Sequence, residues 1–294
     1  MITRFRVAGL TLAAYSRRRT TLLSLPQTFR SFVCADGADI RLDLAEEPPP
    51  KPDPTELLFD SGAVWRVYRS GGGFLYTFNT SRLDPPLYKA VEIDRSLRRG
   101  TLYYPRPREG RRPPSALSYP LDELLFQHRF AREGSMEVHA FGVAGGDGAL
   151  LFCGHSGAGK TTMARLWRRR RPGDLILSDD RVIVRPGKGG LWAYGTPWHG
   201  EGCFGSPEGR PVGAVFFLRH ARRTVATRLD VPAAASRLFV RTFPPPWDRD
   251  ALDAVLGTCS RLAGDVPCYD LGVCPGKSVL DVVRSAVQSS NAHA

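Results

Sequence analysis

The sequence has 294 residues, of which 42% are hydrophobic and 24% are charged, an ordinary globular balance. This composition excludes a wholly disordered chain and a collagen-like one. No stretch approaches the roughly 18–20 unbroken apolar residues of a transmembrane helix, so we expect no membrane span. The net charge of +12 permits an acidic partner but does not identify one.

The cysteines and lysines narrow the chemistry further. The six cysteines form no CxxC pair, and the chain is too long for a disulfide scaffold, so we predict reduced thiols in a cytoplasmic protein. Only five of the 41 basic residues are lysines. A lysine inside a phosphate-binding motif, as Lys160 is, therefore stands out.

Residues 1–114 predict a β-rich N-terminal domain. The apolar run at its start faintly resembles a signal peptide, but Gly9 and Thr11 interrupt it and no cleavage site follows, so a strand is expected there. Runs rich in Val, Phe, Tyr and Thr indicate strands at 5–15, 63–68, 74–78, 88–93 and 101–104. Proline-rich residues 47–54 predict a loop, and the Pro/Arg-rich residues 105–114 predict an exposed linker.

Residues 115–294 predict a mixed α/β domain, so the fold class is α/β with a smaller β-rich domain before it. Helical periodicity indicates helices at 121–133, 160–171, 248–262 and 278–288. Apolar runs indicate strands at 136–143, 149–153, 175–177, 182–184, 191–194, 212–218 and 268–273. A glycine-rich turn at 145–148 joins the first two of these strands.

A phosphate-binding loop follows the strand at 149–153. Residues 154–161 fit G-x-x-x-x-G-K-[ST], between an apolar strand and an amphipathic helix. Glycines let the backbone approach an anion at a helix N-terminus, Lys160 can reach the β- and γ-phosphates, and the Thr161 hydroxyl can bind Mg²⁺. We therefore predict ATP and Mg²⁺ as cofactors. The predicted nucleotide-binding residues are Gly154, His155, Ser156, Gly157, Ala158, Gly159, Lys160, Thr161 and Thr162. A degenerate site that binds nucleotide without turnover is the alternative.

Two adjacent carboxylates, Asp179 and Asp180, follow the apolar strand predicted at 175–177. Neighbours on an extended backbone point to opposite sides, so the two need different roles. One can help to hold Mg²⁺, and the other can accept a proton from an attacking hydroxyl. The alternative is that one of them is a turn or cap residue or pairs with Arg181.

Two other features lie near these motifs. His139 lies on the apolar strand before the phosphate loop, and its pattern alone predicts a core histidine. The glycine-rich segment 195–205 predicts either a mobile lid, with Glu201 as a metal ligand, or a structural turn region.

Taken in order, these residues resemble the catalytic domain of bacterial HPr kinase/phosphorylase. The closer resemblance is to the HPr-kinase-related proteins found beside ribosomal-peptide biosynthesis genes, including lasso-peptide kinases. Val138-His139 precedes Lys160 by 21 residues, and Ser-Asp-Asp-Arg-Val at 178–182 is close to the family's Ala-Asp-Asp-Arg-Val. The segment 195–201 resembles the Gly-Thr-Pro-Trp-His-Gly-Glu of the peptide-cluster relatives, and the resemblance covers about residues 117–285.

The resemblance implies a fold related to phosphoenolpyruvate carboxykinase. It implies a functional His139, with Asp180 as the proton acceptor. It implies Thr161 and Glu201 as Mg²⁺ ligands, to which the residue pattern adds Asp179. It also implies a late basic residue that steadies the transferring phosphoryl group, for which Arg241 is our candidate and Arg237 the alternative. With Lys160, the predicted catalytic residues are therefore Asp180, His139, Lys160 and Arg241.

The sequence thus predicts an ATP- and Mg²⁺-dependent kinase that phosphorylates a hydroxyl, expected to be a serine of a peptide or small protein such as a ribosomal-peptide precursor. The N-terminal domain is expected to bind the peptide, for example along a strand edge. The long glycine-rich signature and the usual N-terminal domain of HPr kinases are missing, so HPr, a hexamer and phosphorylase activity are not carried over; a homo-oligomer is left open. One alternative is a non-catalytic ATP-binding switch. Another is a nucleic-acid-dependent ATPase, but no nucleic-acid motif accompanies the charge and no such partner is expected.

Overall fold

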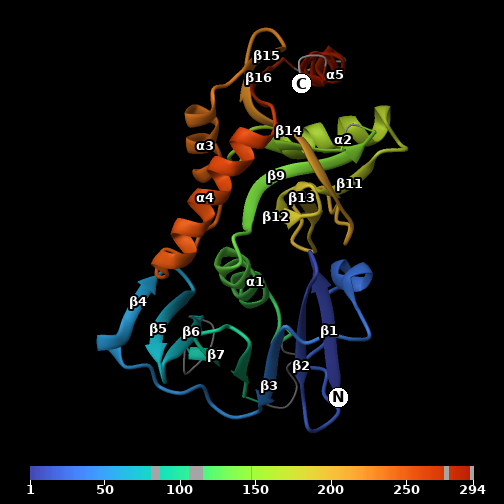
Figure 1. Cartoon of the computed structure of the whole chain (residues 1–294). Coiled ribbons are helices and arrows are strands. Elements are labelled where there is room, and N and C mark those ends of the chain that lie inside the picture. Colours follow the sequence, from blue (N-terminus) through green and yellow to red (C-terminus); the bar gives the residue numbers. More distant parts are fainter. Residues whose placement is uncertain (81–86, 106–114, 147, 275–277, 292–294) are drawn as a thin grey trace. The chain divides into compact units, whose positions relative to one another are not determined.

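Figure 1 shows the computed structural model, which describes residues 1–80, 87–105, 115–146, 148–274 and 278–291. The chain forms two compact units, Met1–Phe126 and Gln127–Ala294. The predicted linker lies outside the described residues except for Pro105, and Asp147 of the predicted glycine-rich turn lies outside them too. The predicted domain boundary after residue 114 stays a prediction.

The first unit is built on one mixed sheet of eight strands in the order β1-β2-β3-β8-β7-β6-β5-β4. The pairs β2–β3 and β3–β8 are parallel, and the other pairs are antiparallel. Short 3-10 helices, η1 (Gln27–Phe32) and η2 (Pro54–Glu56), lie in the connections. The strands are β1 (Ile2–Val7), β2 (Leu10–Tyr15), β3 (Ile40–Ala45), β4 (Leu57–Asp60), β5 (Trp65–Ser70), β6 (Gly73–Asn79), β7 (Leu87–Ile93) and β8 (Arg99–Tyr103).

The N-terminal segment corrects one prediction, because residues 5–15 are not a single strand. They belong to a hairpin in which β1 and β2 pair in register from Ile2 opposite Tyr15 to Val7 opposite Leu10. The two turn residues between the strands, Ala8 and Gly9, have φ of 46° and 87°. Two residues in the left-handed region make the tight turn that matches the twist of paired strands.

The second unit holds another sheet of eight strands and four helices. The strand order is β10-β9-β12-β13-β14-β16-β15; β11 also pairs with β9, and β10 also pairs with β14. The strands are β9 (Met136–Gly145), β10 (Gly148–Cys153), β11 (Leu175–Ser178), β12 (Arg181–Gly187), β13 (Gly190–Gly195), β14 (Gly209–His220), β15 (Val225–Arg228) and β16 (Cys268–Val273). The helices are α2 (Lys160–Arg170), α3 (Val231–Phe239), α4 (Arg249–Asp265) and α5 (Ser278–Asn291); α1 (Leu121–Arg132) precedes them.

Five of these strands close into a ring. The long strand β9 pairs with β12 through its first half and with β10 through its second half. Likewise, β14 begins against β13 and continues parallel to β10. The pairing β12–β13 completes the circuit β10-β9-β12-β13-β14. Strand β14 is parallel to both β10 and β16, so the carboxyl ends of these three strands lie at one common edge of the sheet.

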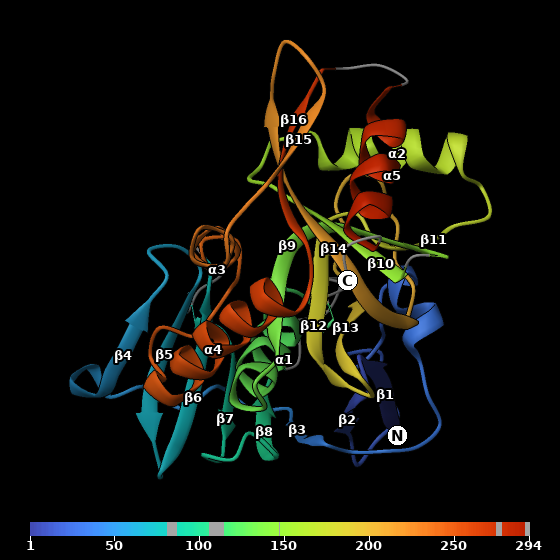
Figure 2. The same cartoon turned by 45° about the horizontal axis from the view of Figure 1, so that its top comes forward.

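Side chains on the two faces of the second sheet pack into two separate hydrophobic cores. Phe141, Phe152 and Phe216 pack with residues of α2 and α5, whereas their chain neighbours, such as Leu151 and Phe217, pack with α3 and α4. Because side chains of a strand alternate between its faces, each pair of helices covers its own face. In Figure 2 α2 lies beside α5, and α3 lies beside α4. The expected mixed α/β class is confirmed.

The sequence predicts no membrane-spanning helix and reduced cysteines. No helix among the described residues is long and apolar enough to cross a membrane. All six cysteines, each within the described ranges, are free thiols. Burial raises the pKa of Cys153 to about 12, so this thiol, next to the phosphate loop, stays protonated at neutral pH.

Candidate active site

The predicted phosphate loop joins the end of β10 to the start of α2 at the common edge of the parallel strands. Gly159 is the N-cap of α2, with φ of 98°, and Gly157 has φ of 81°. A side chain at Gly154 would place its Cβ 2.6 Å from Ala158 Cβ. All three glycines are therefore needed, two for their left-handed backbone and one for a close approach.

Lys160 spans the inside of this loop. Its ammonium donates hydrogen bonds to the carbonyl oxygens of Gly154 at 2.9 Å and His155 at 3.1 Å, and its side chain is 6% exposed. Burial lowers the pKa of Lys160, and the nearby Asp180 carboxylate opposes that shift. The ammonium group of Lys160 is therefore buried inside the loop and bonded to two of its backbone carbonyls.

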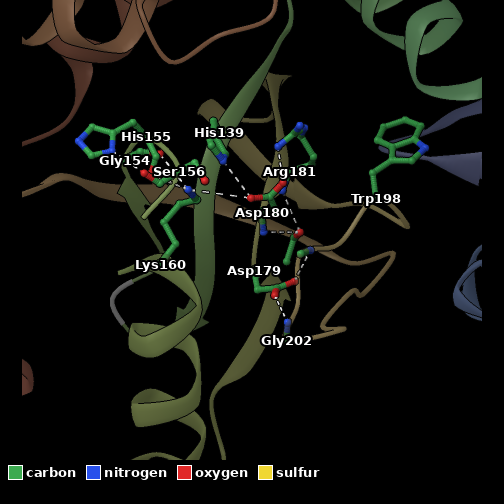
Figure 3. Close-up of polar contacts among 12 residues, drawn as sticks. His139, Gly154, His155, Ser156, Lys160, Asp179, Asp180, Arg181, Trp198 and Gly202 are labelled. Atoms are coloured by element: carbon green, nitrogen blue, oxygen red, sulfur yellow. Dashed lines mark hydrogen bonds and ion pairs between the residues drawn. The ribbon is translucent and has the colours of Figure 1, made fainter. Parts of the chain in front are cut away.

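His139 and Asp180 are brought together by the pairing of β9 with β12. Arg181 lies opposite His139 in this register, and Ala140 donates its N–H to the Asp180 carbonyl at 3.1 Å. The side chains meet with His139 Nε2 2.9 Å from Asp180 Oδ1, and Lys160 Nζ lies 4.0 Å from the same oxygen. Figure 3 shows the Asp180 carboxylate between the histidine and the lysine.

The charge state of Asp180 follows from these neighbours. Burial acts to raise its pKa, but the hydrogen bond with His139 and the nearby positive charges outweigh burial and lower the pKa overall. Asp180 is therefore ionised at neutral pH, close to the lysine of the phosphate loop.

Arg181 holds the other side of Asp180. Its guanidinium pairs with Asp180 Oδ2 and with Glu137 Oε1, the latter at 3.1 Å, and stacks 4.4 Å from the centre of the Phe243 ring. Pairing with Arg181 is the alternative role that the sequence left open for one of the two aspartates. Asp180 makes this pair, and it also contacts His139 and Lys160. Sequence reasoning missed Glu137, a buried carboxylate on an apolar strand, which is an unusual residue in such a place.

Asp179 points away from Asp180, as neighbours on an extended backbone must. Its side chain is fully buried, and its two oxygens accept the backbone N–H groups of Gly200 at 3.0 Å and Gly202 at 2.7 Å. Figure 3 shows this contact directed toward Gly202, away from the lysine. Its role as a metal ligand stays a prediction.

Glu201 and Thr161 are the remaining predicted metal ligands. Glu201 is exposed and lies between the two glycines that bind Asp179. The tip of this loop lies against the site, because a Cβ on Gly200 would be 3.2 Å from Asp180 Cβ. Thr161 and Thr162 lie in the first turn of α2, half-buried and exposed. Within the described ranges, no three His, Cys, Asp or Glu side chains converge as a metal group.

The two candidate arginines differ in their partners. Arg237 Nη1 pairs with Asp270 Oδ1 at 2.5 Å. Arg241 Nη1 donates to the Arg237 carbonyl at 2.9 Å, and its guanidinium lies 5.5 Å from the Phe217 ring centre. Its buried Nε has no hydrogen-bond partner among the residues that the structure describes. The Arg241 carbonyl accepts the N–H of His139 at 2.8 Å, so its backbone is attached to the site.

The outer side of the loop carries two exposed histidines. His155 Nδ1 lies 2.7 Å from the Ser156 carbonyl, and His220 Nε2 lies 3.2 Å from the Gly157 carbonyl. Sequence reasoning named His155 and Ser156 but missed His220. His220 is the last residue of β14, which is parallel to β10. A histidine at the carboxyl end of such a strand could have been singled out, because ligands bind at the carboxyl ends of parallel strands.

Comparisons with known proteins give similarities among solved structures. Neither the protein-family models nor the curated protein sequences contain a match to the chain. Among solved structures, the HPr(Ser) kinase/phosphatase from Coxiella burnetii is similar, with a TM-score of 0.35 and 12% identity, over 53% of this chain and 91% of that chain. A similarity at this level carries no functional conclusion, which has to come from the geometry of the site.

Proposed function

We propose that this protein is an ATP- and Mg²⁺-dependent kinase that transfers the γ-phosphoryl group to a hydroxyl. The observation that carries the proposal is the ionised Asp180 carboxylate, 2.9 Å from His139 Nε2 and 4.0 Å from the ammonium of Lys160 in the phosphate loop. A nucleotide-binding lysine and a carboxylate that can receive a proton are the two groups that phosphoryl transfer to an alcohol needs.

The ligand that we propose for the loop is a nucleoside triphosphate. No atom lies within 4 Å of where a Cβ would be at Gly157 or Gly159, whereas a Cβ at Gly154 would clash with Ala158 on the inside of the loop. The backbone N–H groups at the start of α2 form an anion-binding end, where the helix dipole favours phosphate. Lys160, now bound to two loop carbonyls, can exchange those hydrogen bonds for phosphate oxygens.

The donor set for Mg²⁺ is a hydroxyl and carboxylates, the oxygen ligands that this ion prefers. Thr161 in the first turn of α2 and the exposed Glu201 would hold it, and Asp179 is the third predicted ligand. When bound, Mg²⁺ neutralises charge on the phosphate oxygens. The part that we propose for the chain is to supply these donors.

Asp180 would orient the acceptor hydroxyl and receive its proton. Its lowered pKa keeps it ionised and able to accept a hydrogen bond, but makes it a weak base. It therefore takes the proton late, as the new O–P bond forms and the hydroxyl becomes strongly acidic. His139 and Arg181 hold the two carboxylate oxygens in place.

Arg241 is the better candidate for steadying the transferring group. Its backbone is attached to His139, and its buried Nε is unbonded within the described part of the chain, whereas Arg237 is paired with Asp270. A buried N–H donor without a partner is costly unless a ligand satisfies it, so an anionic oxygen is a suitable partner.

The acceptor that we propose is a serine of a peptide or small protein, such as a ribosomal-peptide precursor. Support comes from the first unit, whose sheet ends in the short strand β4, paired only with β5 among the described strands. An unpaired strand edge can bind an extended peptide by main-chain hydrogen bonds. Deleting residues 1–114 should abolish peptide binding and leave ATP binding; a folded fragment that has lost both would contradict this role.

The test is incubation with Mg²⁺ and γ-labelled ATP against serine-containing peptides and small proteins. We expect label on a serine of the acceptor, and a rate at least about 100-fold lower in Asp180→Asn with ATP still bound. Lys160→Ala should lose ATP binding as well. Tight ATP binding with no labelled product, in the presence of every acceptor tested, would favour a nucleotide-dependent switch instead.

A further inference from the structure

We infer that Asp179 is a positioning residue whose buried carboxylate fixes the loop tip, residues 200–202, and so places Glu201 beside Asp180. The inference rests on the proposed function and deepens it. It assigns control of the metal-binding carboxylate to a residue that need not touch the metal.

The first observation is the pair of hydrogen bonds. Each oxygen of Asp179 accepts the N–H of one glycine, Gly200 at 3.0 Å and Gly202 at 2.7 Å, and the two glycines flank Glu201. The carboxylate is fully buried. Hydrogen bonds to a charged acceptor are shorter and about twice as strong as neutral ones, so the pair holds the tip firmly.

The second observation is why these two positions are glycine. Neither Gly200 nor Gly202 has a left-handed backbone, so their conformation alone does not call for glycine. A Cβ on Gly202 would lie 2.5 Å from Asp179 Oδ2, and one on Gly200 would lie 3.1 Å from the same oxygen. The missing side chains make room for the carboxylate.

The third observation is that other contacts hold the two arms of this loop. On one arm, the Thr196 hydroxyl donates to the Arg181 carbonyl at 2.8 Å. On the other, Ser206 donates its N–H to the Leu177 carbonyl at 2.9 Å, and the Arg168 guanidinium lies 5.2 Å from the Phe204 ring centre. Asp179 ties the tip between these arms to the end of β11.

Glu201 depends on this arrangement. It is exposed, so its carboxylate is free to reach a ligand, while Gly200 beside it lies against Asp180. Releasing the tip would leave Glu201 with many positions, and ordering it again on metal binding would cost conformational entropy. The affinity for Mg²⁺ should fall as a result. The hydrogen bonds of the Asp179 carboxylate go to the 200–202 loop, and its charge is the smallest of the named influences on the pKa of Lys160, so the affinity of the phosphate loop for nucleotide should change little.

The experiment compares Asp179→Asn with Glu201→Gln in the full chain. In Asp179→Asn we expect faster hydrogen exchange at the amides of residues 200–202 and a Mg²⁺ requirement about tenfold higher, equivalent to about 1.4 kcal/mol. ATP affinity without Mg²⁺ should stay within about twofold. Glu201→Gln should raise the Mg²⁺ requirement with no change in exchange. The matched control is Asp174→Asn, whose carboxylate accepts Trp167 Nε1 at 2.8 Å, and it should change neither.

Unchanged exchange in Asp179→Asn would overturn the inference, and a raised Mg²⁺ requirement beside it would make Asp179 a direct ligand. If that variant does not fold, Gly202→Ala breaks the same contact from the loop side. Because its Cβ would also lie 2.8 Å from the Phe204 ring, it is made together with Phe204→Ala, and Phe204→Ala alone is the control. Faster exchange of the tip in the double variant than in Phe204→Ala supports the inference, and equal exchange in both overturns it. Because hydrogen exchange needs no substrate, a protein that transfers no phosphoryl group would contradict the proposed function without deciding this point.

Discussion

His139 Nε2 and Asp180 Oδ1 lie 2.9 Å apart although 41 residues separate them in the chain. The contact exists because β9 pairs with β10, which leads into the phosphate loop, and also with β11 and β12, the strands before and after Asp180. His139 therefore helps to set both the position and the charge of Asp180.

Replacing this histidine should change the pH dependence of the reaction. The pKa of Asp180 is low because the hydrogen bond with His139 and nearby cations outweigh burial, so His139→Ala should raise it. We expect the rate to fall at least about 100-fold and its acid limb to move to higher pH. Rates measured from well below pH 3.8, the ordinary value from which the Asp180 pKa is lowered, up to pH 8 test this, and Asp180→Asn should remove the limb. An acid limb that stays in place in His139→Ala would assign it to another group.

The phosphate loop should not tolerate a methyl group at Gly154. Its Cβ would lie 2.6 Å from Ala158 Cβ, so Gly154→Ala should distort the loop and weaken ATP binding at least about tenfold. Calorimetric titration with ATP measures the effect. Gly257→Ala, which meets nothing within 4 Å, is the control and should bind normally. Equal affinities would show that the loop adjusts.

Asp248 should matter for stability and not for catalysis. Its buried carboxylate lies 2.7 Å from His128 Nε2 and 2.5 Å from Arg132 Nε, and it caps α4 through the Ala251 N–H. Asp248→Ala should lower the free energy of unfolding by about 3 kcal/mol. Chemical denaturation at pH 7 measures this loss. The exposed Asp265, paired with Arg261 one helical turn away, is the control, since its removal should cost under about 1 kcal/mol.

The cluster of Asp248, His128 and Arg132 should also make the stability of the protein depend on pH. Burial lowers the pKa of His128, so the unfolded state binds more protons near the ordinary histidine pKa of about 6.5. The free energy of unfolding should therefore rise with pH through that range. His128→Gln should reduce the slope, and an unchanged slope would place its origin elsewhere.

Lys89 makes an independent prediction for the first unit. Its buried ammonium donates to the Ser118 carbonyl at 3.0 Å, and burial lowers its pKa to about 8. Unfolding returns the pKa to about 10.4, so between these values the unfolded state holds one more proton. Lys89 should therefore add to the free energy of unfolding as the pH rises, by at most about 1.4 kcal/mol per pH unit. Denaturation of the wild type and of Lys89→Met at pH 7 to 10 measures this contribution as the difference between their slopes, because burial raises the pKa of the Cys153, Cys259 and Cys268 thiols and these groups act in the opposite direction. Equal slopes would contradict it.

The elements with a strong local pattern were predictable. The strand at 268–273 matches β16, and the helix at 121–133 differs from α1 by one residue. Apolar runs and boundary signals within these segments suffice to predict them. The phosphate loop belongs to the same class, since glycine spacing and flanking elements are all local.

Other elements left weaker traces. The sequence pattern predicts one strand over the hairpin of β1 and β2, because the turn between the two strands is only two residues long. Strands β3, β4 and β15 were not predicted, and two of these have four residues. Helix α3 was missed although Asp230 and Pro232 at its start are the usual capping signals.

The site shows where local patterns stop. The alternation of Asp179 and Asp180 predicted two different roles, and the structure gives them different partners. Which partner goes to which residue depends on strand pairing over long separations, as does the contact of His220 with Gly157, 63 residues apart. A single sequence does not encode such pairings in any short window.

The ring of β10, β9, β12, β13 and β14 has a consequence for local opening. In a closed circuit, detaching one strand strips hydrogen-bond partners from two others, so none of the five can fray alone. The backbone amides beside His139, those at the base of the phosphate loop and those that follow Asp180 should then exchange with solvent as one cooperative unit. Motions that admit substrate are left to the loops outside the ring, such as the segment that carries Glu201.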